Sequence, residues 1–218
     1  MNMKKRAIIT DIIQNKIIAI VRGLSTEETV KTVEALYKGG IRFAEITFDQ
    51  SGKTSWEDTA DCINKLAEQF KNKVIIGAGT VMNIKQVELA YEAGAEYIIS
   101  PDTNETVIKK TVELSMVSIP GALTPTEIAY AYSCGADFVK IFPITSLGPD
   151  YVTAVLAPLA HIPMLAVGGI NIENMNQYLN AGIKGFGIGG NIINKQYIKN
   201  GEYDKITSLA KKYTEIVK

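Results

Sequence analysis

The chain has 218 residues, of which 46% are hydrophobic and 21% charged, and its formal net charge is zero. This length and composition suit either one α/β barrel or two smaller domains. The balanced charge predicts no nucleic-acid partner and no polybasic membrane face. No apolar stretch reaches the length of a membrane span, and Asp11 interrupts the apolar run near the start. We therefore expect a cytoplasmic protein.

Short β-branched runs alternate with longer amphipathic segments along the whole sequence. They predict eight strands, at residues 17–22, 43–48, 74–80, 97–101, 117–121, 138–143, 164–169 and 185–190. A helical pattern follows each strand, and an extra helix is expected around residues 2–15. Because no linker or low-complexity stretch divides this repeat, we predict an α/β fold, a single (βα)8 barrel domain over residues 1–218. An open doubly wound sheet is the alternative.

Signals for helix ends support this repeat. The segments 25–28 and 124–127 match capping boxes, and the second has proline at the first helical position. Glycine follows several helical patterns where the chain must turn left-handed before the next strand, at Gly40, Gly94, Gly135 and Gly182.

Lys140 interrupts an otherwise apolar predicted strand, Phe-Val-Lys-Ile-Phe-Pro at 138–143. A lysine walled by apolar side chains loses hydration in its charged form, so its pKa falls and its amine becomes a nucleophile near neutral pH. Schiff-base chemistry on a carbonyl substrate is the functional interpretation. The structural alternative is a lysine that reaches solvent at the strand end or pairs with a carboxylate.

In a barrel, alternate strand residues face the lumen and chemistry collects at the carboxyl ends of the strands. If Lys140 faces the lumen, the same face predicts that Ile76 and Ala78 on the third strand, and Ile98 on the fourth, also point inward. The polar residues expected at the mouth are Arg22, Glu45, Thr47, Thr80, Ser100 and Lys140. Each has a structural alternative, such as an ion pair between Glu45 and Arg22, but together they indicate a site.

Glycine pairs end the seventh and eighth strands, at 168–169 and 189–190, followed by Asn171 and Asn191. Barrel enzymes often bind phosphate on backbone amides at these two positions. We expect an anion site there, although glycine also simply ends strands.

The histidine and cysteines predict neither a metal nor a cofactor. His161 is the only histidine and is expected in a loop, while Cys62 and Cys134 lie in helical patterns without metal-ligand spacing. Two inert thiols are expected.

The chain resembles the class I pyruvate aldolases that cleave 2-keto-3-deoxy-6-phosphogluconate (KDPG) or 2-keto-4-hydroxyglutarate (KHG). Matching motifs are Ala-Ile-Val-Arg at 19–22, Ala-Glu-Ile-Thr at 44–47, Gly-Ala-Gly-Thr-Val at 77–81, Ile-Ser-Pro at 99–101, Lys-Ile-Phe-Pro at 140–143 and Val-Gly-Gly-Ile at 167–170. The resemblance implies a homotrimer of barrels that needs no metal. It also implies site roles: Lys140 as Schiff-base lysine, Glu45 as general acid/base, Thr80 near the pyruvate carboxylate, Pro101 and Phe142 as walls, and Gly168, Gly169, Gly190 and Asn191 as lining and phosphate contacts.

Three positions depart from many members of that family, which have arginine at Asp49, threonine at Val167 and serine at Asn191. The loss of an arginine leaves Arg22 as the candidate for the substrate carboxylate, and we expect Asp49 to lie near the anionic substrate and weaken its binding. Val167 resembles the 2-keto-3-deoxy-6-phosphogalactonate (KDPGal) branch.

The expected function is cleavage of KDPG to pyruvate and glyceraldehyde 3-phosphate, of KHG to pyruvate and glyoxylate, or of both. Alternatives are a KDPGal aldolase, a phosphosugar isomerase or epimerase, and a non-catalytic sugar-phosphate-binding barrel.

Overall fold

Nine parallel strand segments form one continuous sheet in the computed structural model, which describes residues 2–218. The segments are β1 (Ile17–Val21), β2 (Phe43–Thr47), β3 (Ile75–Gly79), β4 (Tyr97–Ile99), β5 (Val117–Ile119), β6 (Gly121–Ala122), β7 (Val139–Ile141), β8 (Met164–Val167) and β9 (Gly185–Ile188). Their order in the sheet is β5-β4-β3-β2-β1-β9-β8-β7-β6. All eight predicted strands are present.

The sheet closes into a barrel because β5 and β6 are two pieces of one strand, separated only by Pro120. The amides of Phe138 and Lys140 donate to the carbonyls of Ser118 and Pro120, which joins this strand to β7. The predicted (βα)8 barrel is therefore confirmed, and the open sheet is excluded.

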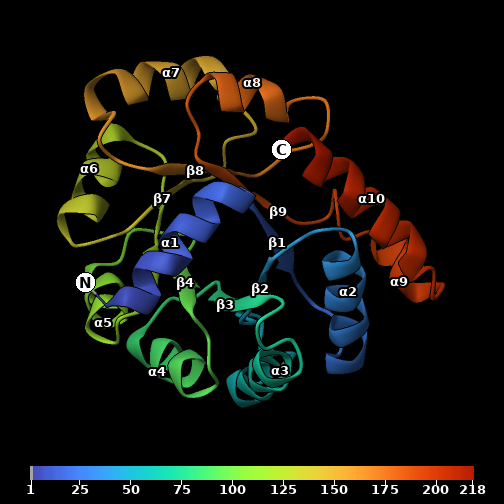
Figure 1. The fold of residues 1–218 in the computed structure, drawn as a ribbon. Coiled ribbons are helices and arrows are strands. Elements are labelled where there is room, and N and C mark those ends of the chain that lie inside the picture. Colours follow the sequence, from blue (N-terminus) through green and yellow to red (C-terminus); the bar gives the residue numbers. More distant parts are fainter. Residues whose placement is uncertain (1) are drawn as a thin grey trace.

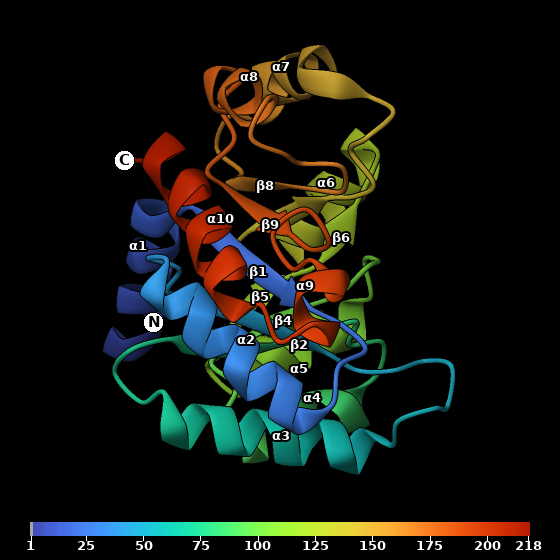
Figure 2. The ribbon, with the colours of Figure 1, turned by 90° about the vertical axis from the view of Figure 1, so that its right-hand side faces the viewer.

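Helices surround the barrel in Figures 1 and 2. They are α1 (Met3–Asn15), α2 (Thr26–Lys38), α3 (Trp56–Gln69), α4 (Ile84–Glu92), α5 (Glu105–Glu113), α6 (Pro125–Ser133), α7 (Gly148–Leu159), α8 (Met175–Asn180), α9 (Lys195–Lys199) and α10 (Tyr203–Ile216). Both predicted capping boxes are formed, at Ser25 and at Thr124. The four predicted helix-end glycines have positive φ angles. None of these helices, in the range 2–218, is long and apolar enough to cross a membrane.

The extra helix α1 lies across the amino-terminal end of the barrel (Figure 1). Its Ile8 and Ile12 belong to the apolar cluster that fills the lumen at this end of the barrel. Lys5 of the same helix forms a buried ion pair with Asp137, with Nζ 2.8 Å from Oδ2. This end of the lumen is thus closed, and the opposite end carries the polar residues.

The lumen-facing residues of β3 and β4 differ from our prediction. Tyr97 and Ile99 belong to the inner cluster, whereas Ile76, Ala78 and Ile98 pack outward against the helices. The prediction was one residue out of step because two of the three inward positions of β3, Gly77 and Gly79, are glycines and show no apolar pattern; the third is Ile75. These glycines leave lumen space that side chains from neighbouring strands occupy.

Candidate active site

Lys140 is the buried cation of the barrel mouth. It lies in the middle of β7, with only 6% of its surface exposed, and its backbone pairs with Gly121 on one side and Leu165 on the other. Burial lowers the pKa of its ammonium group; the Arg22 charge lowers it further, and the Glu45 charge opposes the shift. The expected buried amine is therefore present, and Lys140 does not reach solvent, which was the first of the two structural alternatives.

Glu45 lies in β2 on the lumen face, 1% exposed. Burial raises the pKa of its carboxyl group, while the positive charges of Lys140 and Arg22 act in the opposite direction. The charges of Lys140 and Glu45 thus influence each other across the lumen. Burial lowers the pKa of Lys140 and raises that of Glu45, so both pKa values lie closer to neutral pH, where proton transfer is efficient.

Gly79 makes room for this carboxylate. A Cβ atom built on Gly79 would overlap Glu45 Oε1, far inside the 3.0 Å that real Cβ atoms keep from their neighbours. Gly79 has no positive φ, so only space demands glycine here. Sequence reasoning identified the Gly-Ala-Gly motif but missed its purpose, because the overlap involves residues 34 positions apart.

Arg22 and Thr80 meet at the mouth as predicted. Arg22 Nη2 donates a hydrogen bond of 2.8 Å to Thr80 Oγ1, and Gln50 Nε2 donates to the Thr80 carbonyl. Thr80 has φ = 56°, a left-handed conformation that is strained for a β-branched residue. This turn brings its side chain to the mouth although Ala78 points away from the lumen.

Pro101 and Phe142 lie beside Lys140. The Phe142 ring centre is 4.6 Å from Lys140 Nζ, and the Pro101 carbonyl packs closely against Gly121, the strand partner of Lys140. Phe142 therefore borders the amine, and Pro101 packs against the strand next to it.

The glycine loops lie next to one another at the ends of β8 and β9. Gly168 and Gly169 have φ angles of 102° and 71°, and Asn191 Nδ2 donates 2.7 Å to the Ile170 carbonyl, which ties the two loops together. Gly190 has open space where a Cβ atom would lie. A ligand group could approach the backbone here.

Val167 points into the lumen from the end of β8. It is buried and packs over Gly187 of β9, beside Ile20. This position lies on the same face as the lumen residue Leu165, so Val167 presents an apolar surface to the mouth.

Ser100 does not belong to the site, contrary to our prediction. Its Oγ donates 2.7 Å to the Val81 carbonyl, so it stabilises the turn after β3. Thr47 is buried on the lumen side of β2 but its Oγ1 bonds to the Val21 carbonyl. Both hydroxyls therefore donate to backbone carbonyls of neighbouring segments.

Asp49 is also engaged within its own loop. Its carboxylate accepts hydrogen bonds from the amides of Ser51, Lys53 and Thr54 and from the Ser51 hydroxyl. These bonds, those of Ser51 first, hold the pKa of Asp49 well below its usual range. The expectation that this carboxylate opposes an anionic substrate was incomplete, because its main contacts are with the loop that it folds.

A cavity of about 430 Å³ adjoins Arg22. Its lining includes Ile20, Gly189, Gly190 and Lys195, and Lys195 Nζ lies close to Gly23. Sequence reasoning missed Lys195; its only signal was a cation shortly after the glycine pair of the eighth strand.

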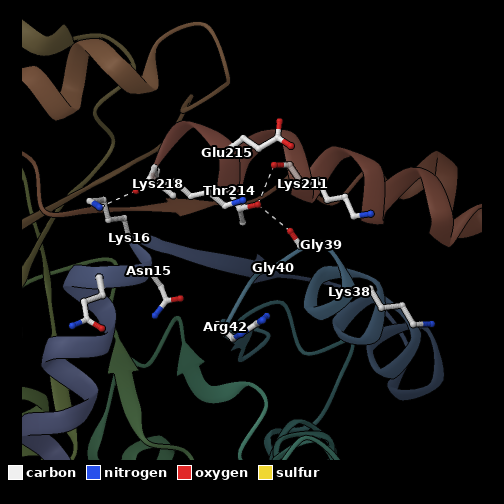
Figure 3. A pocket seen from close by; sticks show the side chains of 12 residues that line it. Asn15, Lys16, Lys38, Gly39, Gly40, Arg42, Lys211, Thr214, Glu215 and Lys218 are labelled. Atoms are coloured by element: carbon white, nitrogen blue, oxygen red, sulfur yellow. Dashed lines mark hydrogen bonds between the residues drawn. The ribbon is translucent and has the colours of Figure 1, made fainter.

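A second cavity, of about 530 Å³, lies at the opposite end of the barrel and is also rich in cations (Figure 3). Lys16 Nζ donates to the Val217 carbonyl, and Arg42 Nη1 donates to the carbonyls of Tyr37 and Ile41. Cations near helix carboxyl ends compensate the negative end of the helix dipole. This cluster therefore stabilises the ends of α2 and α10, at the opposite end of the barrel from the Lys140 site.

Fold and site together describe a parallel barrel with a desolvated lysine, a buried carboxylate and an arginine at one mouth. The family model for KDPG and KHG aldolase matches residues 8–209. The 2-dehydro-3-deoxy-6-phosphogalactonate aldolase of Escherichia coli K12 is 32% identical over 202 residues, 92% of this chain and 96% of the relative. The KHG/KDPG aldolase of the same strain is 32% identical over 192 residues, 87% of this chain and 86% of the relative.

A solved structure of KDPG aldolase from Legionella pneumophila, with pyruvate captured at low pH as a covalent carbinolamine intermediate, is also similar. Its TM-score is 0.83 at 25% identity, covering 96% of this chain and 97% of that one. The chain belongs to the KDPG and KHG aldolase family and is a carbon–carbon lyase.

Proposed function

We propose that the protein is a class I aldolase in which Lys140 forms a Schiff base with a 2-keto acid and Glu45 transfers protons. The observation that carries this proposal is the buried amine of Lys140 at the mouth, which shares the lumen with the buried Glu45 carboxyl, each charge acting on the other's pKa. The covalent carbinolamine of pyruvate captured in the Legionella aldolase supports the same chemistry for this chain.

The reaction begins when neutral Lys140 attacks the C2 ketone to give a carbinolamine, which loses water to form the protonated imine. Glu45 supplies and removes the protons of these steps. It then takes the proton of the C4 hydroxyl through a water molecule, and the C3–C4 bond breaks. The electron pair of this bond moves into the imine, giving the pyruvate enamine and a free aldehyde. Protonation at C3 and hydrolysis of the imine release pyruvate and restore Lys140.

Substrate binding follows from the charges and free space of the mouth. Arg22 and Thr80, already joined by a hydrogen bond, would hold the carboxylate next to the ketone. Pro101 and Phe142 would wall the reacting carbon atoms.

The distal end of the substrate would lie against the glycine loops. Gly168, Gly169 and Gly190 would offer backbone, and the second N–H of the Asn191 amide remains for a phosphate or a carboxylate. Lys195 lines the cavity shared by Arg22 and Gly190 and would add a positive charge on this side.

The proposed reactions are cleavage of KDPG to pyruvate and glyceraldehyde 3-phosphate, of KHG to pyruvate and glyoxylate, or of both. The alternative is KDPGal cleavage, which is favoured by the apolar Val167 side chain in the lumen. The Escherichia coli relative named for the phosphogalactonate compound supports it as well.

We further propose a homotrimer in the cytoplasm, acting without a metal or cofactor. The trimer rests on the family resemblance. The cytoplasmic location is supported by the two free cysteines, Cys62 and Cys134, because reducing compartments keep thiols unpaired.

Trapping with sodium borohydride tests the chemistry. With pyruvate present, borohydride should inactivate the protein and add a pyruvate-derived mass to the peptide that contains Lys140. Lys140→Arg should abolish both labelling and turnover, because a guanidinium stays protonated. Lys184→Arg, an exposed position before β9, is the matched control and should behave like wild type. Labelling of another lysine, or an active Lys140→Arg variant, would refute the mechanism.

A panel of cleavage assays on KDPG, KHG and KDPGal then identifies the substrate. Trapping at Lys140 without cleavage of any of these compounds would favour the non-catalytic binding barrel.

A further inference from the structure

The side chain of Tyr97 lies in the lumen over Gly77, the residue of β3 that pairs with Glu45. Its ring covers Gly77 so closely that a Cβ atom there would overlap the ring. The ring also packs against Phe43 of β2, with ring centres 6.0 Å apart. Tyr97 therefore extends from β4 across β3 toward the strand that carries Glu45.

Two buried polar atoms in this region have no hydrogen-bond partner among residues 2–218, the Tyr97 hydroxyl and Glu45 Oε2. The surrounding inner cluster is apolar and already contains Phe43 and Phe138, so packing alone would be satisfied by phenylalanine at position 97. A buried hydroxyl without a partner is costly, and so is a buried carboxylate oxygen without a donor. Each group can supply what the other lacks.

The hydroxyl remains a donor at all relevant pH values. Burial raises its pKa well above its ordinary value, and the negative charge of Glu45 raises it further. Lys140 and Arg22 are the charged groups that oppose the burial effect on Glu45, but Glu45 Oε2 accepts a hydrogen bond from neither of them. The Tyr97 hydroxyl can supply that missing donor.

We propose that Tyr97 is a positioning residue for Glu45, its hydroxyl donating a hydrogen bond to one water that in turn donates to the Glu45 carboxylate. The inference rests on the proposed role of Glu45 in proton transfer. A donor to the carboxylate stabilises its charged form and restricts its orientation, so Glu45 is ionised and aimed when the C4 hydroxyl loses its proton.

The test compares the pH dependence of kcat for wild type, Tyr97→Phe and Tyr178→Phe. Tyr178 is a buried tyrosine of α8 in the outer cluster and serves as the matched control. Loss of the donor raises the pKa of Glu45. The acid limb of the kcat–pH profile should therefore move to higher pH by about one unit in Tyr97→Phe, the scale of one hydrogen bond to a charged group, and should not move in Tyr178→Phe. KM should change little.

Two further measurements separate positioning from a structural role. In a Glu45→Gln background, Tyr97→Phe should have almost no additional effect on kcat, because its target has gone. 3-Fluorotyrosine at position 97 keeps the ring and makes the hydroxyl a stronger donor, so it should move the acid limb down; this also provides the answer if Tyr97→Phe does not fold.

An acid limb unmoved by Tyr97→Phe, or by 3-fluorotyrosine if the phenylalanine variant does not fold, overturns the inference. The inference is also overturned if Tyr97→Phe lowers kcat by the same factor in the Glu45→Gln background as in the wild-type enzyme. Borohydride trapping of Lys140 in the same preparations distinguishes the two proposals. If trapping fails in wild type, both fall; if trapping succeeds and the pH profile does not move, only the role of Tyr97 falls.

Discussion

Gly79→Ala should disable catalysis while preserving the barrel. The added methyl group would occupy the space of Glu45 Oε1, and real Cβ atoms keep at least 3.0 Å from such a neighbour. The backbone of Gly79 is already in a conformation that alanine adopts, so the main effect is displacement of the Glu45 carboxylate.

The size of the effect follows from that displacement. The carboxylate must move by roughly 1 Å or more, and misplacement of this size costs about 10²-fold in rate. Overpacking of a filled site costs about 1–3 kcal/mol of folding free energy. We expect kcat to fall about 10²-fold, with a lower melting temperature but native circular dichroism.

The assay couples pyruvate release to lactate dehydrogenase and follows NADH. Glu45→Ala provides the matched background, because its short side chain leaves the methyl group room. Gly79→Ala should therefore cost little further activity in the double variant. A single variant with kcat within threefold of wild type, or fully additive losses in the double variant, would show that Gly79 does not accommodate Glu45.

Four other predictions concern the same mouth. Glu45→Gln should lower kcat about 10²-fold or more while pyruvate still binds, as measured by steady-state kinetics and pyruvate titration; a change in KM alone would make Glu45 a binding residue. Arg22→Met should weaken pyruvate binding by roughly 2 kcal/mol, about 30-fold, and unchanged affinity would assign the carboxylate to another residue. The rate of borohydride trapping should rise with pH around the lowered pKa of Lys140, since only the neutral amine attacks. In Arg22→Met this rise should occur at higher pH, because the Arg22 charge lowers the pKa of Lys140. A rise at the same pH in both proteins would contradict this coupling. Val167→Thr should raise the ratio of kcat/KM for KDPG over KDPGal about tenfold, the worth of one hydrogen bond of roughly 1.4 kcal/mol, and an unaltered ratio would show that C4 stereochemistry is read elsewhere.

The sequence alone determined the architecture, because strand and helix periodicity, helix caps and helix-end glycines are local signals. The sequence predicted eight βα units. Both predicted capping boxes are formed in the structure, and all four predicted glycines have positive φ angles. Lys140 was also identifiable without a structure, since a cation inside an apolar strand contradicts its surroundings whatever the fold.

Only the tertiary structure decided which residues face the lumen on β3 and β4. Glycine has no side chain, so Gly77 and Gly79 left no apolar pattern and the alternation was read one residue out of step. Because of this error, Ser100 was predicted at the mouth although its hydroxyl donates to the Val81 carbonyl, and Tyr97 was not predicted to face the lumen.

The same limit applies to Asp49 and to the spaces that glycines provide. The family resemblance indicated that Asp49 lies near the substrate, but its carboxylate is bound by the amides of its own loop. The fit of Tyr97 over Gly77 and of Glu45 over Gly79 joins neighbouring strands. Such contacts depend on how the strands are aligned in space, and a chain read residue by residue contains no signal for that alignment.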